Sequence, residues 1–163
     1  MNRRSLLAVM AAVLALVSSP ARADTGAAAK LETLLKASDY KSAAKVKDGV
    51  WTLDFNGKQL PKFKLVVTAA EKDVGKDGHG IITARVNPVP RDQLPRNRAT
   101  LTAAILKANS DFDYVKIGFD GDGDIFVRAD IPPGADVASF KTIVEQTAAA
   151  ADAFYGRIKQ YLR

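Results

Sequence analysis

The sequence predicts an α+β protein with an antiparallel sheet of about five strands, in the order helix, three strands, helix, two strands, long helix. Several short runs alternate apolar and polar residues and are separated by glycine, asparagine and proline, which is typical of strands joined by turns. The run from Asp136 to Tyr161 instead repeats apolar residues every three or four positions, which is typical of a long amphipathic helix. Strands joined by short turns pair antiparallel, and the helices then cover one face of their sheet.

The N-terminal 23 residues are typical of a cleavable secretory signal. Arg3 and Arg4 precede the apolar run 6–17, and Ala21-Arg22-Ala23 is a small-x-small ending of the kind that signal peptidase cuts. The apolar run is shorter than the roughly 20 residues that a membrane-spanning helix needs. We therefore expect cleavage after Ala23 rather than a membrane anchor. Residues 24–163 are expected to form a single periplasmic or secreted domain without an integral membrane segment.

The charge and the cysteine content bear on whether the protein binds nucleic acid and on whether disulfides stabilise it. The chain has 24 Lys and Arg against 18 Asp and Glu, and removing Arg3, Arg4 and Arg22 leaves 21 against 18, a net charge of +3. A small excess without a basic stripe or interleaved aromatics does not indicate a nucleic-acid partner. The chain has no cysteine, so an exported protein of this sequence depends on a packed core and not on disulfides.

The first half of the mature chain reads as one short helix and three strands. Asp24 or Thr25 can cap a helix that runs to about Ala37. The predicted strands are "VWTLDF" (50–55), "KFKLVVTAA" (62–70) and "GIITARV" (80–86), and Asn56-Gly57 after the first of them is a favoured hairpin dipeptide. An aromatic such as Trp51 within this alternation is more often a core residue than a ligand platform.

A proline-rich connector, "NPVPRDQLPRNR" (87–98), then leads to a second helix. Its prolines end the preceding strand. Its arginines, Arg91, Arg96 and Arg98, could attract an anion, but exposed arginines ordinarily face water, so a solvated connector is favoured. Asn97 can cap a helix that ends near Asn109.

The stretch "FDGDGDIF" (119–126) is either a calcium loop or a hairpin turn. The flanking apolar residues match if Phe119 faces Ile125 and Ile117 faces Val127, which leaves a three-residue loop, 121–123, with Gly123 in the position that needs a left-handed residue. An EF-hand loop counted from Asp120 would need glycine and glutamate where the sequence has isoleucines. We predict a turn, with no specific metal site and no cofactor, although the register sets Asp120 opposite Asp124.

The same register predicts a candidate partner-binding surface. It places Lys116 opposite Arg128, beside Phe126, on the face away from the predicted core. Cationic and aromatic side chains together are common at interfaces, so an acidic protein or peptide could bind there. The alternative is a solvated sheet face on which nearby Asp130 reduces the repulsion between the two cations.

The last helix is predicted to be roughly 40 Å long, which exceeds what covering the sheet requires. Its N-terminal half should pack on the sheet. Its C-terminal half, with Phe154, Ile158 and Tyr161, is predicted to contact a partner, and we expect a homodimer. Gly156 costs about 1 kcal/mol in a helix interior, which indicates a close contact or a bend at that position.

The residues do not indicate an enzyme. The only histidine, His79, lies in the turn-like "DGHG" and is more often solvent-facing than catalytic in such a place. The chain has no cysteine nucleophile, no recognisable Ser-His-Asp motif and no glycine-rich phosphate loop between a strand and a helix.

The element order, with the hairpin "KIGFDGDGDIFVRADIP" followed by a long C-terminal helix, resembles the YbjN-type sensory transduction regulators, which are grouped with type III secretion chaperone-like proteins. The resemblance covers roughly residues 31–162. It implies an α+β fold with an antiparallel sheet, frequent dimers, and partner binding rather than catalysis. Secretion chaperones act in the cytoplasm, so the expected export signal departs from that pattern.

Two hypotheses of function follow. The first is an exported, non-catalytic partner-binding protein with a chaperone-like or regulatory role. The alternative is a periplasmic carrier of a small molecule or lipid, in which Trp51, Phe55 and Phe63 would line a cleft between the sheet and the helices.

Overall fold

The computed structural model describes residues 26–70, 81–132 and 134–162. The predicted signal (1–23) and His79 lie outside the described residues. The helices are α1 (Ala27–Ala37), α2 (Ala99–Asp111) and α3 (Val137–Ile158), with 3-10 turns at Arg91–Gln93 and Lys159–Tyr161. The strands are β1 (Ala44–Lys47), β2 (Val50–Phe55), β3 (Phe63–Ala70), β4 (Ile81–Val89), β5 (Lys116–Phe119) and β6 (Ile125–Ile131).

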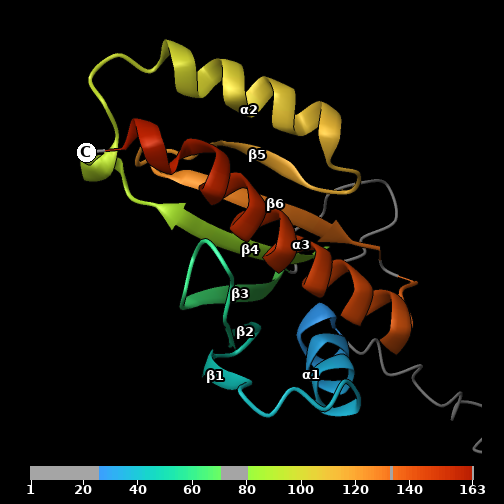
Figure 1. Cartoon of the computed structure of the whole chain (residues 1–163). Helices are drawn as coiled ribbons and strands as arrows, with labels where there is room; N and C mark the ends of the chain where they lie inside the picture. The colour runs from blue at the N-terminus through green and yellow to red at the C-terminus, as the bar shows by residue number, and fades with distance from the viewer. Residues whose placement is uncertain (1–25, 71–80, 133, 163) are drawn as a thin grey trace, which may run out of the picture.

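The strands form one antiparallel sheet in the order β1-β2-β3-β4-β6-β5 (Figure 1). This confirms the predicted α+β class and the long C-terminal helix. The sheet has one strand more than the expected five, because β1 precedes the first predicted strand. The sequence of β1, "AKVK", is only four residues long and exposed throughout, so it carries no burial pattern that could reveal it.

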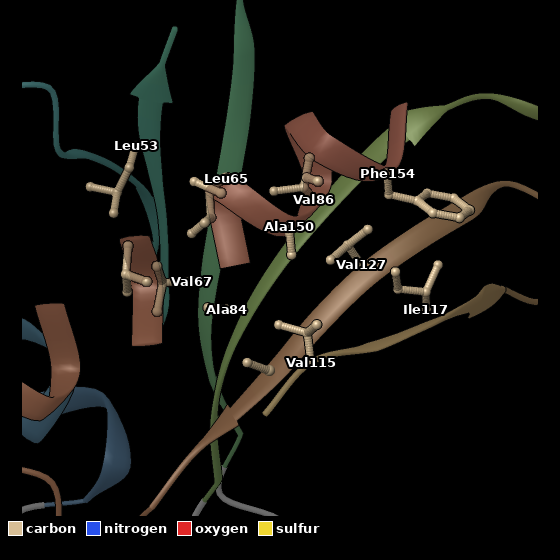
Figure 2. Close-up of a cluster of buried hydrophobic side chains, with 14 of the residues drawn as sticks. Leu53, Leu65, Val67, Ala84, Val86, Val115, Ile117, Val127, Ala150 and Phe154 are labelled. Atoms are coloured by element: carbon tan, nitrogen blue, oxygen red, sulfur yellow. The ribbon is translucent and has the colours of Figure 1, made fainter. Parts of the chain in front are cut away.

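The helices pack against one face of the sheet. Helix α3 lies across β4 and β6, α1 packs against β3, and α2 lies beside edge strand β5 and contacts α3 (Figure 1). The inward-facing strand residues are buried beneath α3, and Figure 2 shows Leu65, Val86 and Val127 gathered with Ala150 and Phe154 of that helix. Among the described residues, no helix is both long and apolar enough to cross a membrane.

The core fills the space in which the carrier hypothesis requires a cleft. Leu53, Leu65 and Val67 are 0% exposed between the sheet and the helices. Trp51 packs against this core, as predicted. Among the described residues, the predicted cleft between sheet and helices is therefore occupied by side chains.

Helix α3 begins and ends close to the predicted residues. The Asp136 Oδ1 accepts a hydrogen bond from the backbone N–H of Ser139 (2.8 Å), which caps the first turn. The α-helix ends at Ile158 and continues as a 3-10 turn to Tyr161. The N-cap of helix α2 is Arg98, one residue after the predicted cap, and the side chain of Asn97 accepts a hydrogen bond from the N–H of Ala99 (3.0 Å).

The C-terminal half of α3 packs against the loop between β2 and β3. The Asp152 carboxylate accepts hydrogen bonds from the backbone N–H groups of Lys58 (3.1 Å), Gln59 (2.8 Å) and Leu60 (2.7 Å). A Cβ at Gly156 would lie 2.7 Å from the Cγ of Gln59. The close contact predicted at Gly156 is therefore made within the chain, to this loop.

Candidate interaction surface

The hairpin between β5 and β6 has the predicted register. Phe119 pairs with Ile125 and Lys116 pairs with Arg128. Gly123 has a φ of +85°, the left-handed conformation that glycine adopts without steric cost. The stretch "FDGDGDIF" is therefore a tight turn between two strands.

Asp120 organises this turn as an acceptor. Its Oδ1 accepts hydrogen bonds from the backbone N–H groups of Asp122 (3.0 Å) and Asp124 (2.9 Å). Its Oδ2 accepts from the guanidinium of Arg85 and from the amide of Asn87 (3.1 Å). Burial works to raise the pKa of Asp120, but these backbone groups, Asn87 and Arg85 together lower it below its ordinary value.

The predicted opposition of Asp120 and Asp124 is relieved by separate partners. Asp124 Oδ1 accepts from the backbone N–H of Arg91 (2.7 Å), at the start of the connector. Both carboxylates are thus committed to donors of this chain. Within the described ranges, no three His, Asp or Glu side chains lie together as a metal site requires.

Three cations lie side by side on the face of the sheet away from the helices. Lys116 on β5 is opposite Arg128 on β6, and Arg128 is opposite Arg85 on β4. We call these three residues the cationic row. The sequence indicated Lys116 and Arg128 but not Arg85, because strands β4 and β6 are separated by the connector and α2, and only the folded sheet brings them into register.

Two aspartates offset the cationic row only in part. Asp130 lies 3.3 Å from the Lys116 Nζ and 3.2 Å from the Arg128 Nε, and Asp120 pairs with Arg85. The contact to the Arg128 Nε is close enough for an ion pair, but the N–H, which is buried, does not point at the carboxylate as a hydrogen bond requires. Like charges in directly opposed positions are destabilising. The row keeps one cation more than the carboxylates that pair with it.

Phe126 gives the row an aromatic neighbour. It pairs across the hairpin with Gly118, and a Cβ at Gly118 would lie 3.1 Å from the Phe126 ring. The guanidinium carbon of Arg85 lies 5.3 Å from the centre of the same ring, within the range of a cation–π contact. The ring is therefore fixed between a glycine and a cation of the row.

The cationic row is accessible to a partner. The side chains of Lys116, Arg128 and Arg85 are 71%, 42% and 37% exposed. Among the described residues, no helix packs over them. The structure thus brings together three of the predicted partner-binding residues, Lys116, Arg128 and Phe126, and adds Arg85.

The other three predicted residues do not form a surface. Phe154 and Ile158 are 0% exposed and belong to the core beneath α3, because the C-terminal half of the helix packs on its own sheet and on the β2–β3 loop. Only Tyr161 remains accessible, at 40% exposure. The extra length of α3, which suggested a partner, is accounted for by its contacts with the sheet and the β2–β3 loop of the same chain.

The arrangement defines a class of protein: an α+β domain in which helices cover one face of an antiparallel sheet, with a charged second face. No protein-family model and no curated protein matches the chain. Among solved structures, YbjN from E. coli, a protein proposed to be a transcription regulator, superposes with a TM-score of 0.53 and 15% sequence identity, covering 82% of this chain and 93% of that chain. The chain has a YbjN-like fold, which confirms the resemblance inferred from its sequence.

Proposed function

We propose that the protein is an exported, non-catalytic binding protein, with a chaperone-like or regulatory role, that receives an acidic protein or peptide on the cationic row. The observation that supports this most directly is the alignment of Lys116, Arg128 and Arg85 across three neighbouring strands, with two carboxylates to offset three cations. An added carboxylate would relieve the remaining repulsion between opposed cations.

The composition of the row supports protein recognition. Arginine and aromatic side chains are enriched at protein interfaces, and Phe126 lies two residues from Arg128 on β6 and within cation–π range of Arg85. Because the guanidinium group presents donors in a planar fork, it can hold a carboxylate bidentately. The YbjN neighbour is proposed to be a regulator, and a regulatory or binding role for this chain rests on that analogy of fold alone.

The test is a crosslinking pull-down of the tagged chain expressed with its N-terminal segment, read by mass spectrometry. Exchanging both Lys116 and Arg128 for glutamate should abolish capture of an acidic partner. The matched control exchanges Lys107 and Lys141, two exposed lysines on helices α2 and α3, for glutamate. A partner captured equally by both double variants would show that the cationic row is not its binding site.

We also propose that the protein forms a homodimer. Phe154 and Ile158 are buried in the core, so the dimer contact must involve other residues. We place the contact at Leu106 on α2, an apolar side chain that is 66% exposed. Light scattering on the mature chain should give twice the monomer mass, and Leu106→Lys should reduce it. A monomeric mass for the unaltered chain would exclude a stable dimer.

The carrier hypothesis remains as a second candidate at a different place. A hollow of about 470 Å³ lies at the end of the β2–β3 hairpin, lined by Asp54, Phe55, Asn56, Lys62, Phe63 and Lys64. The rings of Phe55 and Phe63 are stacked 5.8 Å apart beside it. An apolar fluorescent dye that binds the protein and is lost in Phe63→Ala would favour a carrier. Trp51 does not line this hollow among the described residues.

A further inference from the structure

A second surface, distinct from the cationic row, runs along helix α3. Two neighbouring hollows, of about 530 Å³ and about 370 Å³, share Tyr114 and Gln146 in their lining, so they form one groove. We call it the α3 groove. One side of its lining is formed by residues of α3 from Ala138 to Ala153, and the other side by residues 111–114 together with Asp130 and Pro132.

The floor of the groove is one face of α3. The exposed lining residues of the helix recur every three or four positions from Ala138 to Ala153, and they are small or uncharged. Fifteen steps of helix rise span roughly 22 Å, about four turns. The groove is therefore as long as a complete short helix.

The opposite wall carries a large exposed ring. Tyr114 lies where the two hollows meet and is 78% exposed, the highest value among the large apolar side chains described. A hydrophobic surface of this kind, bordered by polar residues, is typical of an interaction site.

The charges on the groove have one sign. Among its described lining residues are three carboxylates, Asp111, Asp113 and Asp130, and no lysine or arginine. Asp111 is paired with Arg157 and Asp130 with cations of the row, while Asp113 makes no ion pair with any described residue. Asp113 is therefore the rim carboxylate that a cationic side chain of a partner can pair with, and the lining adds no cation that would repel it.

The backbone around the groove favours a helix over a strand. An added strand needs unpaired N–H and C=O groups, but the floor is an α-helix whose backbone groups are bonded internally. The nearest sheet edge, β5, has its Ile117 N–H and C=O occupied by the side chain of Asn109. Small residues on the floor permit close approach of a second helix.

From these observations we infer that the α3 groove docks an amphipathic, cationic helix of a partner protein, with its small apolar face on α3 and its lysines or arginines along the aspartate rim. This inference goes beyond the proposed function, because it concerns another surface with the opposite charge preference. Asp130 borders both surfaces, since it pairs with Lys116 and Arg128 and also lines the groove.

The probe for this inference is a fluorescein-labelled helical peptide of about five turns, built from leucine and alanine on one face and lysine on the other. The reference peptide replaces every lysine with glutamate. Binding is measured by fluorescence anisotropy on the double variant Lys116→Glu, Arg128→Glu as well as on the unaltered chain, because the cationic row of the unaltered chain can itself bind the glutamate peptide. The double variant should show saturable, salt-sensitive binding of the lysine peptide and none of the glutamate peptide.

Two variants test the location of binding. Ala149→Trp places a large side chain in the groove from an exposed position, and Asp113→Lys reverses the charge of the rim. Each should weaken binding at least tenfold. The matched controls, Ala103→Trp on the exposed face of α2 and Asp92→Lys in the connector, should leave it unchanged. Circular dichroism establishes that each variant is folded.

Three results would overturn the inference. The first is that the lysine peptide shows no saturable binding, and the second is that the groove variants and the control variants bind it equally. The third is that Ala149→Trp loses self-association, which would assign the groove to a second copy of the chain. The double exchange of Lys116 and Arg128 for glutamate separates this inference from the proposed function. It should abolish acidic-partner capture and should not weaken binding of the lysine peptide, because it frees the Asp130 carboxylate at the groove.

Discussion

The side chain of Asn109 pairs with the backbone of Ile117 as a neighbouring strand would. Its Nδ2 donates to the Ile117 carbonyl oxygen (2.9 Å), and its Oδ1 accepts from the Ile117 N–H (2.8 Å). Strand β5 is one edge of the sheet, and exposed edges invite pairing with other chains. The last turn of α2 thus seals the centre of this short edge.

Asn109→Ala should destabilise the protein and open the β5 edge. Loss of two hydrogen bonds should lower the free energy of unfolding by about 1–3 kcal/mol, because the Ile117 groups are left without their partners. Urea denaturation measures this value, and light scattering detects any added self-association. Ser110→Ala, at the adjacent exposed position, is the control. An unchanged midpoint for Asn109→Ala would show that water replaces the amide without cost.

Gly156→Ala should not give the stabilisation that helix propensity predicts. Alanine is favoured over glycine by about 1 kcal/mol in a helix interior. Here the new Cβ would lie 2.7 Å from the Cγ of Gln59, so the Gln59 side chain must leave its position. We expect Gly156→Ala alone to lower the thermal midpoint and to raise it in a Gln59→Ala background. A midpoint raised equally in both backgrounds would contradict the contact.

Much of the fold could be predicted because its signals are local. The turn at Gly123, the register of Lys116 with Arg128 and the cap at Asp136 depend on residues close in the sequence, and the structure has all three. Arg85 and the packing of Phe154 could not be predicted in this way. The neighbours of Arg85 depend on which distant strands pair. Phe154 belongs to the apolar stripe of the last helix, but the stripe does not show whether it covers the chain's own sheet or a partner.

Tyr40→Phe should stabilise the protein. The hydroxyl oxygen of Tyr40 is buried without a hydrogen-bond partner among the described residues, and its ring makes edge-to-face contacts with Phe55 and Phe140. Burial, with a smaller contribution from Glu145, raises the pKa of Tyr40 to about 12. Removing an unpaired buried hydroxyl should raise the free energy of unfolding by about 1 kcal/mol. Tyr161→Phe, at an exposed position, should change nothing, and a less stable Tyr40→Phe would reveal an unrecognised partner.

Calcium should not stabilise the hairpin turn. Asp120 already accepts two backbone N–H groups, Arg85 and Asn87, so a cation would have to displace them. Asp120→Ala should lower the thermal midpoint, whereas Asp122→Ala, whose side chain is exposed, should not. Titration calorimetry with calcium should show no specific binding. Sub-micromolar affinity would contradict the assignment of this stretch as a turn.

The contact between Asp152 and the β2–β3 loop should make stability depend on acid pH. Burial works to raise the pKa of Asp152, but the N–H groups of Leu60, Gln59 and Lys58 and the charge of Lys58 lower it below its ordinary value. A carboxyl with a lowered pKa in the folded state contributes stability above its unfolded pKa of about 4, and loses it as the pH falls through the folded value.

Asp152→Asn should therefore reduce stability near neutral pH by about 1 kcal/mol, since the amide nitrogen would face the Lys58 N–H and two donors cannot pair. The difference from the unaltered chain should begin to shrink below about pH 4, where Asp152 becomes protonated in the unfolded chain, and should keep shrinking as the pH falls through the lower pKa of the folded state. Urea midpoints at a series of pH values measure both effects. Asp54→Asn, which removes the exposed ion pair with Lys64, serves as the control, and a difference that stays constant from neutral to acid pH would exclude a role for the Asp152 charge.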